Sequence, residues 1–156
     1  MASLLKQRNT DAAVMCIDTW LGSLEHFTTM KDHPVWGLQK YRVHGYPRLY
    51  YQFIANALHT GVEDMIVPFP TTSPTAARWL HDREIQADMI FIDASHDEED
   101  VFQDLRSYWP LLRDGGVIFG DDWISGWEGV IQGVGRFAKD RGLVIDIQDD
   151  IWLIRK

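Results

Sequence analysis

Short apolar runs alternate along the chain with longer segments in which apolar residues recur every three or four positions. The short runs predict buried strands, and the longer segments predict helices that turn one apolar face inward. Several helix ends carry matching signals, since Ser73 followed by Pro74 suits a helix start and Gly61 suits a helix end. The predicted strands cover residues 13–17, 65–67, 88–93 and 117–122, and the predicted helices cover residues 2–9, 48–59, 73–82, 95–112 and 128–139.

Two further boundaries are predicted from local spacing. Pro68 and Pro70 directly follow the strand at 65–67 and are expected to close it, because proline cannot donate a ladder hydrogen bond. Ser95 and Glu98 have the spacing of a capping box, which predicts that the next helix starts at Ser95.

Strands and helices in alternation predict an α/β fold of the doubly wound kind, with a mostly parallel sheet. Two apolar segments at 143–147 and 151–154 predict an antiparallel hairpin that closes this sheet. Residues 21–46 have no clean period and hold several glycines and prolines, so they predict a long loop, which is often functional. We expect this loop, which holds His26, His33, Trp36 and His44, to contribute to substrate binding, although its aromatic content also suits ordinary packing.

The composition and the net charge exclude several classes of protein. The 156 residues suit one domain with a real hydrophobic core, and the net charge of −8 offers no basic face for nucleic acid. The apolar runs are too short to cross a membrane, and the first residues lack the pattern of a signal peptide. The single cysteine excludes an internal disulfide, so we expect a cytoplasmic protein.

Acidic residues follow three of the predicted strands. Asp18, Asp93 and the pair Asp121 and Asp122 each come directly after an apolar run. Ligands of open α/β sheets sit beyond the carboxyl ends of the strands, so these acids are expected to share one rim. Carboxylates that lie close together repel each other unless a cation or a donor lies among them, and oxygen ligands favour Mg²⁺. Alternatively, these acids cap the elements that follow them.

His96 lies three residues beyond Asp93, at the start of a predicted helix. One interpretation is a general base that takes a proton from a substrate hydroxyl. The other interpretation is a solvent-facing residue of the first helical turn.

Two stretches of the sequence resemble class I S-adenosylmethionine-dependent methyltransferases: residues 87–96 (ADMIFIDASH) and 108–122 (YWPLLRDGGVIFGDD). Residues 14–23 (VMCIDTWLGS) also resemble the second strand of this family and its exit loop. The resemblance is greatest to small-molecule O-methyltransferases, such as macrolide-sugar and catechol enzymes, and covers the chain from about residue 12. It implies a Rossmann-like sheet and a small-molecule substrate.

The resemblance implies roles for residues that contact the cofactor. Asp18 would accept hydrogen bonds from the ribose hydroxyls of S-adenosylmethionine, and Thr19 and Trp20 follow it in the same loop. Trp20 is expected either near the adenine or in the core. Ser73 and Asp93 are expected to complete the cofactor contacts.

The resemblance also implies a divalent metal ion, Mg²⁺ or another, held by Asp93, Asp121 and Asp122. The catechol enzymes have an amide as the third ligand, so Asp122 adds a further negative charge here. His96 stands in the place of the family's catalytic lysine. The expected reaction is metal-assisted O-methylation, in which His96 deprotonates the substrate hydroxyl.

One feature of the family is not found in the sequence. Family members begin with a strand and a Gly-rich cofactor loop, and no glycine precedes Gly22 here. We therefore expect one N-terminally truncated domain, residues 1–156, in which two strands have lost their common neighbour unless a homo-oligomer fills the gap. A non-catalytic remnant that serves in binding or oligomerisation is the main alternative, and a phosphohydrolase with Asp93 as nucleophile is the third.

Overall fold

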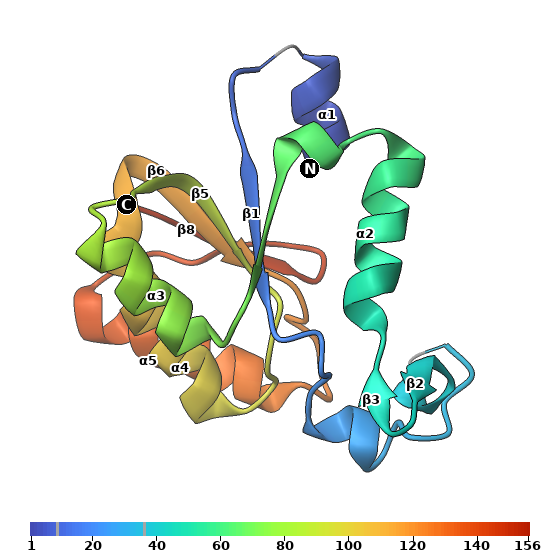
Figure 1. Ribbon diagram of the computed structural model, residues 1–156. Helices are drawn as coiled ribbons and strands as arrows, with labels where there is room; N and C mark the ends of the chain where they lie inside the picture. The colour runs from blue at the N-terminus through green and yellow to red at the C-terminus, as the bar shows by residue number, and fades with distance from the viewer. Residues whose placement is uncertain (9, 36) are drawn as a thin grey trace. The chain divides into compact units, whose positions relative to one another are not determined.

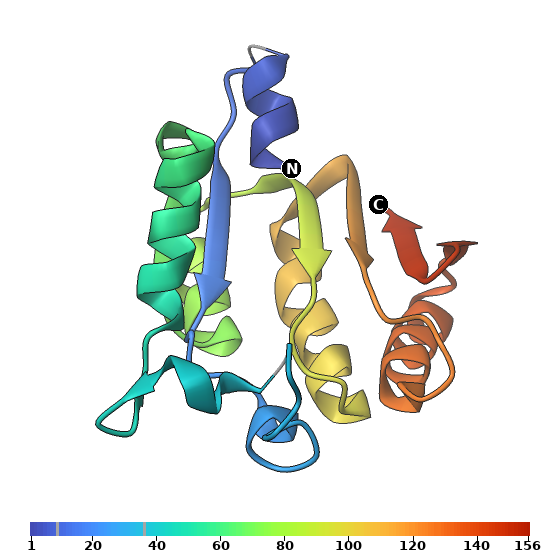
Figure 2. The ribbon, with the colours of Figure 1, turned by 90° about the vertical axis from the view of Figure 1, so that its right-hand side faces the viewer.

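The computed structural model describes residues 1–8, 10–35 and 37–156 and is shown in Figures 1 and 2. Asn9, the last residue of the first predicted helix, and Trp36 of the predicted substrate loop lie outside the described residues. The chain forms two compact units, Met1–Thr72 and Ser73–Lys156. Each unit is described by itself.

The first unit pairs two parallel strands. Its main elements are α1 (Ala2–Gln7), β1 (Val14–Asp18), α2 (Leu49–Thr60), a 3₁₀ turn at Glu63–Met65 and β4 (Ile66–Pro70). The strands run in register from Val14 opposite Ile66 to Asp18 opposite Pro70. The prediction that Pro68 and Pro70 close this strand is wrong. Both prolines lie inside β4, which pairs with β1 alone among the described residues, and an edge strand tolerates a missing donor.

The helix α2 begins and ends close to the predicted positions. Gly61 follows its last residue with φ of 63°, a left-handed conformation, and its N–H bonds to the carbonyls near the helix end. The ammonium of Lys6 on α1 donates to the Gly61 carbonyl at 2.6 Å and to Asp64 at 2.7 Å. These contacts tie α1 to the end of α2.

The segment predicted as a loop without regular structure contains short elements. Two 3₁₀ helices cover Leu24–Phe27 and Leu38–Tyr41, and β2 (Arg42–Val43) pairs with β3 (Tyr46–Pro47). His44 and Gly45 turn this small hairpin with φ of 52° and 81°. Two successive positive φ angles suit a tight hairpin turn, which explains why so short a pairing forms here.

The second unit contains a four-stranded sheet and its helices. Its elements are α3 (Ser73–Asp82), β5 (Ala87–Ile92), α4 (Glu98–Tyr108), a 3₁₀ turn at Trp109–Leu111, β6 (Leu112–Gly120), α5 (Glu128–Arg141), β7 (Asp146–Gln148) and β8 (Ile151–Arg155). The strand order is β5-β6-β8-β7. β5 and β6 are parallel and their arrows point the same way in Figure 2, whereas β8 is antiparallel to both β6 and β7. The predicted closing hairpin is therefore confirmed.

Three helices, α3, α4 and α5, lie on the same side of the sheet in Figure 1. The side chains buried most completely between these layers come from α4, α5 and the sheet: Leu105, Leu112, Ile118, Val134, Phe137, Trp152 and Ile154. α5 approaches α4 closely at Gly133, where an added Cβ would lie 2.8 Å from the Glu98 carbonyl and 3.0 Å from Val101. The rigid sheet and the α4–α5 pair hold the loops that follow β5 and β6.

Helix α4 starts later than the spacing of Ser95 and Glu98 predicts. Asp97 is the N-cap, and its carboxylate accepts from the Glu99 N–H at 3.0 Å. Ser95 instead donates its hydroxyl to Asp100 at 2.8 Å. Residues 95 and 96 therefore stay outside the helix.

The fold class agrees with the sequence prediction. The chain has a mixed α/β fold with parallel strands and a closing antiparallel pair. Within the described residues β1 pairs only with β4, and β5 has a strand partner only in β6. The expectation of a common neighbour strand missing between them stays a prediction.

Candidate active site

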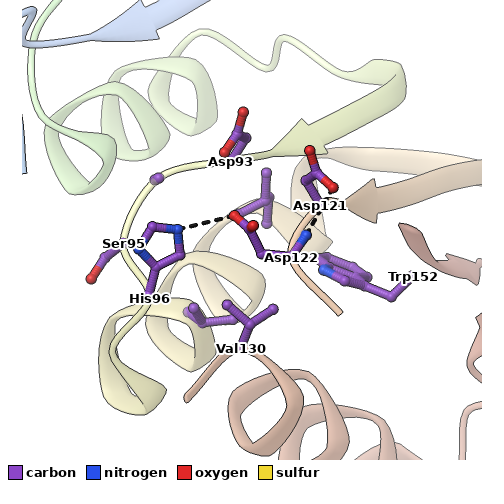
Figure 3. A pocket seen from close by; sticks show the side chains of 10 residues that line it. Asp93, Ser95, His96, Asp121, Asp122, Val130 and Trp152 are labelled. Atoms are coloured by element: carbon purple, nitrogen blue, oxygen red, sulfur yellow. Dashed lines mark hydrogen bonds and ion pairs between the residues drawn. The ribbon is translucent and has the colours of Figure 1, made fainter. Parts of the chain in front are cut away.

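The carboxyl ends of β5 and β6 bring acidic side chains and one histidine together (Figure 3). Asp93 follows β5, and Asp121 and Asp122 follow β6, its parallel neighbour. All three line one small cavity of about 10 Å³ together with His96, and Val130 and Trp152 contribute apolar surface. Parallel strands end at the same edge of a sheet, so this meeting follows from the register of β5 and β6.

His96 and Asp122 form a direct contact between side chains within this cluster. The imidazole Nε2 lies 3.0 Å from the Asp122 carboxylate, as the dashed line in Figure 3 marks, and both side chains are mostly shielded from solvent. Nδ1 of His96 is shielded from solvent as well. Asp122 has φ of 66°, a conformation that only a few side chains tolerate, of which aspartate is one. In this backbone conformation the Asp122 carboxylate lies against the imidazole.

The indole of Trp127 covers one face of this imidazole. The two ring centroids lie 3.8 Å apart with an interplanar angle of 20°, a stacked arrangement. Trp127 is the N-cap residue of α5, whereas His96 precedes α4. The imidazole is thus contacted on its edge by Asp122 and on its face by Trp127.

Asp121 and Trp152 form the other side of the cavity. The Asp121 carboxylate accepts from the backbone N–H of Asp122 at 2.9 Å. Trp152 is almost fully buried, and its indole N–H has no acceptor among the described residues. In Figure 3 its nitrogen lies on the side of Asp122, and the cavity has about the volume that one water requires.

The residues predicted to bind a metal do not form a metal site in this arrangement. No group of three or more His, Cys, Asp or Glu side chains that could hold an ion occurs in the part of the chain that the structure describes. The Asp122 carboxylate faces His96, and a buried N–H donor lines the same cavity, which suits an oxygen acceptor better than a cation. The assignment of Asp93, Asp121 and Asp122 as metal ligands stays a prediction.

Three predicted cofactor residues lie in the first unit, after β1. One carboxylate oxygen of Asp18 accepts from the Trp20 N–H at 2.7 Å, and the Leu21 N–H bonds to the Thr19 hydroxyl at 3.2 Å. The other oxygen of Asp18 has no protein partner among the described residues, and the side chain is exposed. A carboxylate in this setting fits a pair of ribose hydroxyls, because it can accept from both.

Trp20 lies in the core of the first unit. It is 8% exposed, and its ring packs against Tyr50 at 5.0 Å and Phe53 at 5.1 Å. The alternative that assigned Trp20 to the core therefore describes its surroundings in this structure, while its contact with adenine stays a prediction.

Ser73, predicted to contact the cofactor, is bonded to α4 in the second unit. Its hydroxyl donates to Asp104 at 3.3 Å, and its carbonyl accepts from the Tyr108 hydroxyl at 2.9 Å. Burial raises the pKa of Asp104 to about 6, an effect that the Ser73 hydrogen bond opposes and that nearby Asp100 reinforces. Burial also raises the pKa of Tyr108 to about 12.

Trp127 and Trp152 were not identified from the sequence. Trp127 follows a Gly-containing loop and precedes a helix, which gives no periodic signal, and its partner His96 is far away in the sequence. Trp152 alternates with half-buried positions on a closing strand, a pattern that indicates core only. Within the described residues, no helix is both long and apolar enough to cross a membrane.

Comparisons with known proteins agree with the fold. A family model described as a methyltransferase domain matches residues 1–123. The solved structure of CalS11, a TDP-rhamnose 3′-O-methyltransferase of calicheamicin biosynthesis, has a TM-score of 0.65 and 14% identity over 99% of this chain and 64% of that one. The O-methyltransferase NovP has a TM-score of 0.65 and 16% identity, covering 100% of this chain and 65% of that one.

An O-methyltransferase from Bacillus cereus, solved with S-adenosylhomocysteine (SAH), has a TM-score of 0.58 and 16% identity over 99% of this chain and 78% of that one. The comparison with curated protein sequences gave no match. The chain spans about two thirds of the length of CalS11 and NovP. Since the family model covers most of the sequence, the chain belongs to the methyltransferase-domain family and has the fold of the class I S-adenosylmethionine-dependent methyltransferases.

Proposed function

We propose that this chain is an S-adenosylmethionine-dependent O-methyltransferase that acts on a hydroxyl of a small molecule, with His96 as general base. The observation that carries the proposal is the contact between His96 Nε2 and the Asp122 carboxylate at 3.0 Å, inside a cavity that Asp93 and Asp121 also line. A histidine that is paired with a carboxylate at the rim of such a sheet is suited to proton transfer near neutral pH.

The chemistry divides between the cofactor and the residues of the chain. S-adenosylmethionine, when bound, supplies a methyl group on a positively charged sulfur. His96 would take the hydroxyl proton as the substrate oxygen bonds to the methyl carbon and the carbon–sulfur bond breaks, which leaves SAH. The Asp122 carboxylate accepts the hydrogen bond of the Nε2–H, and its negative charge stabilises the imidazolium.

Asp18 is the residue of the first unit that supports cofactor binding in this proposal. Its exposed carboxylate follows β1 and keeps one oxygen available for the ribose hydroxyls. The Asp18→Asn variant retains the shape but replaces one acceptor oxygen by a donor. We expect it to weaken the binding of SAH about tenfold, measured by calorimetry, without changing the fold.

The names of the relatives support a small-molecule hydroxyl as the substrate in this proposal. CalS11 acts on a TDP-rhamnose hydroxyl, and the other matches named above are O-methyltransferases. A panel of TDP-rhamnose, catechol and simple phenols therefore tests the proposal by transfer of a radiolabelled methyl group. Binding of SAH together with transfer to any of these hydroxyls supports the O-methyltransferase, whereas no binding at millimolar SAH favours a non-catalytic module.

The role of His96 has a separate test. His96→Ala is expected to lower the turnover number about 100-fold or more and to leave SAH affinity intact, because the base acts only in the chemical step. His81→Ala, an exposed histidine on α3, is the matched control and is expected to retain full turnover. Turnover of His96→Ala at the wild-type rate would exclude this residue as the base.

Binding of a divalent ion has a test of its own, which does not depend on the role of His96. If Mg²⁺ or Mn²⁺ binds among Asp93, Asp121 and Asp122, either ion is expected to raise the melting temperature. Asp121→Asn would then abolish that rise, because it removes one charged ligand. A rise that persists in this variant places the ion elsewhere.

A further inference from the structure

We propose that Trp127 is a positioning residue that holds the imidazole of His96 in the plane required for proton transfer. This inference rests on the proposed role of His96 as general base. It adds a residue that contacts neither the hydroxyl nor the methyl group and acts only through His96.

The stacking contact is the first support. The centroid distance of 3.8 Å and the angle of 20° place the indole in van der Waals contact with a full face of the imidazole. Rotation of the imidazole about its Cβ–Cγ bond would drive its atoms into the indole. A single hydrogen bond to Asp122 leaves that rotation partly free, so the two contacts fix the ring together.

The backbone around Trp127 supplies the second support. Gly129, two residues into α5, faces the loop that carries His96 so closely that an added Cβ would overlap the His96 carbonyl oxygen and lie 2.8 Å from the Glu98 nitrogen. The start of α5 is therefore pressed against the His96 backbone. This close approach of the two backbones places the indole of Trp127 against the imidazole of His96.

A general requirement for apolar packing does not explain the contact between Trp127 and His96. Trp127 is only partly buried, and the aromatic partner in its stacking contact is the imidazole and not another core side chain. Trp109, by comparison, packs edge-on against Phe137 in the core at 5.5 Å. Trp127 and Trp109 thus have different aromatic partners.

The test compares Trp127→Leu, which keeps an apolar side chain but loses the ring, with Trp127→Phe, which keeps a ring. Trp79→Leu, a partly exposed tryptophan on α3, is the matched control. We expect Trp127→Leu to lower the turnover number about 10- to 100-fold with SAH affinity unchanged, and Trp127→Phe to retain most of the turnover. Turnover of Trp127→Leu at the wild-type rate, or an equal loss in both variants, would overturn the proposal.

Nuclear magnetic resonance of the His96 ring protons gives a second readout that does not depend on activity. The stacked indole is expected to shift these protons upfield, and the shift should be lost in Trp127→Leu and kept in part in Trp127→Phe. Absence of the shift in the wild-type protein would refute the positioning role. Wild-type protein that shows the shift but binds no SAH and transfers no methyl group would instead refute the proposed function while the ring geometry stands.

Discussion

Replacing Asp104 by asparagine is expected to stabilise the protein above pH 6 and to have little effect near pH 4. Asp104 lies on α4, where its carboxylate accepts from the Ser73 hydroxyl at 3.3 Å. Burial, with a smaller contribution from Asp100, raises its pKa from 3.8 to about 6. The ionised form is therefore less favourable in the folded protein than in the unfolded chain.

The sign and size of the effect follow from linkage between protonation and folding. One pKa unit corresponds to 1.36 kcal/mol, so a pKa raised from 3.8 to about 6 costs the folded state about 3 kcal/mol above pH 6. The cost shrinks to about half at pH 5 and disappears below pH 3.8, where the carboxyl is protonated in both states. Asparagine carries no charge and keeps an oxygen that can accept from Ser73, so we expect a gain of about 1–3 kcal/mol at pH 8.

Urea denaturation at pH 8, 5 and 4 measures this difference, followed by tryptophan fluorescence and by circular dichroism. Asp11→Asn, an exposed aspartate in the loop before β1, makes the same change of charge and is the control. The reasoning is refuted if Asp104→Asn is no more stable than Asp11→Asn at pH 8. A gain of equal size at all three pH values would also refute it, because that gain would not come from ionisation.

Two further predictions concern glycines. Gly120→Ala is expected to destabilise the protein by about 1–3 kcal/mol, because an added Cβ would overlap a carbonyl oxygen of β5 and the buried indole of Trp152. A free energy of unfolding in urea within about 0.5 kcal/mol of the wild type, on the order of measurement error, would contradict this. Gly61→Ala is expected to cost about 1–2 kcal/mol because φ is 63° there, whereas Gly135→Ala, in open space on α5, should be neutral or stabilise by up to about 1 kcal/mol; equal melting temperatures for the two variants would remove the conformational argument.

The parts of the site that follow from strand order were predictable from the sequence. Asp93, Asp121 and Asp122 each follow an apolar run, and parallel strands end at one edge, so their meeting required no knowledge of side-chain packing. The helix end at Gly61 was predictable for a similar reason, since a glycine there allows a left-handed residue.

Other features depend on tertiary context that spacing does not contain. Ser95 and Asp97 are both good N-caps two residues apart, and local sequence could not decide between them. The pairing of His96 with Asp122 depends on the positive φ at Asp122, which spacing does not predict. From the sequence alone Pro68 indicates a strand end, because the sequence does not show that β4 is an edge strand.

The division of the chain between its two units gives the proposals a common consequence. The base, its partner Asp122 and its stacking partner Trp127 all lie within Ser73–Lys156, whereas Asp18 lies within Met1–Thr72. The geometry around His96 is held by β5, β6 and the start of α5, none of which involves the Gly-rich loop that the sequence does not contain. Changes at Asp18 should therefore weaken SAH binding and leave the chemical shifts of the His96 ring protons as in the wild type. Changes at Trp127 should alter these chemical shifts and leave SAH affinity unchanged. A variant at Asp18 that moves the His96 resonances would contradict this independence and show that the position of the imidazole depends on Asp18.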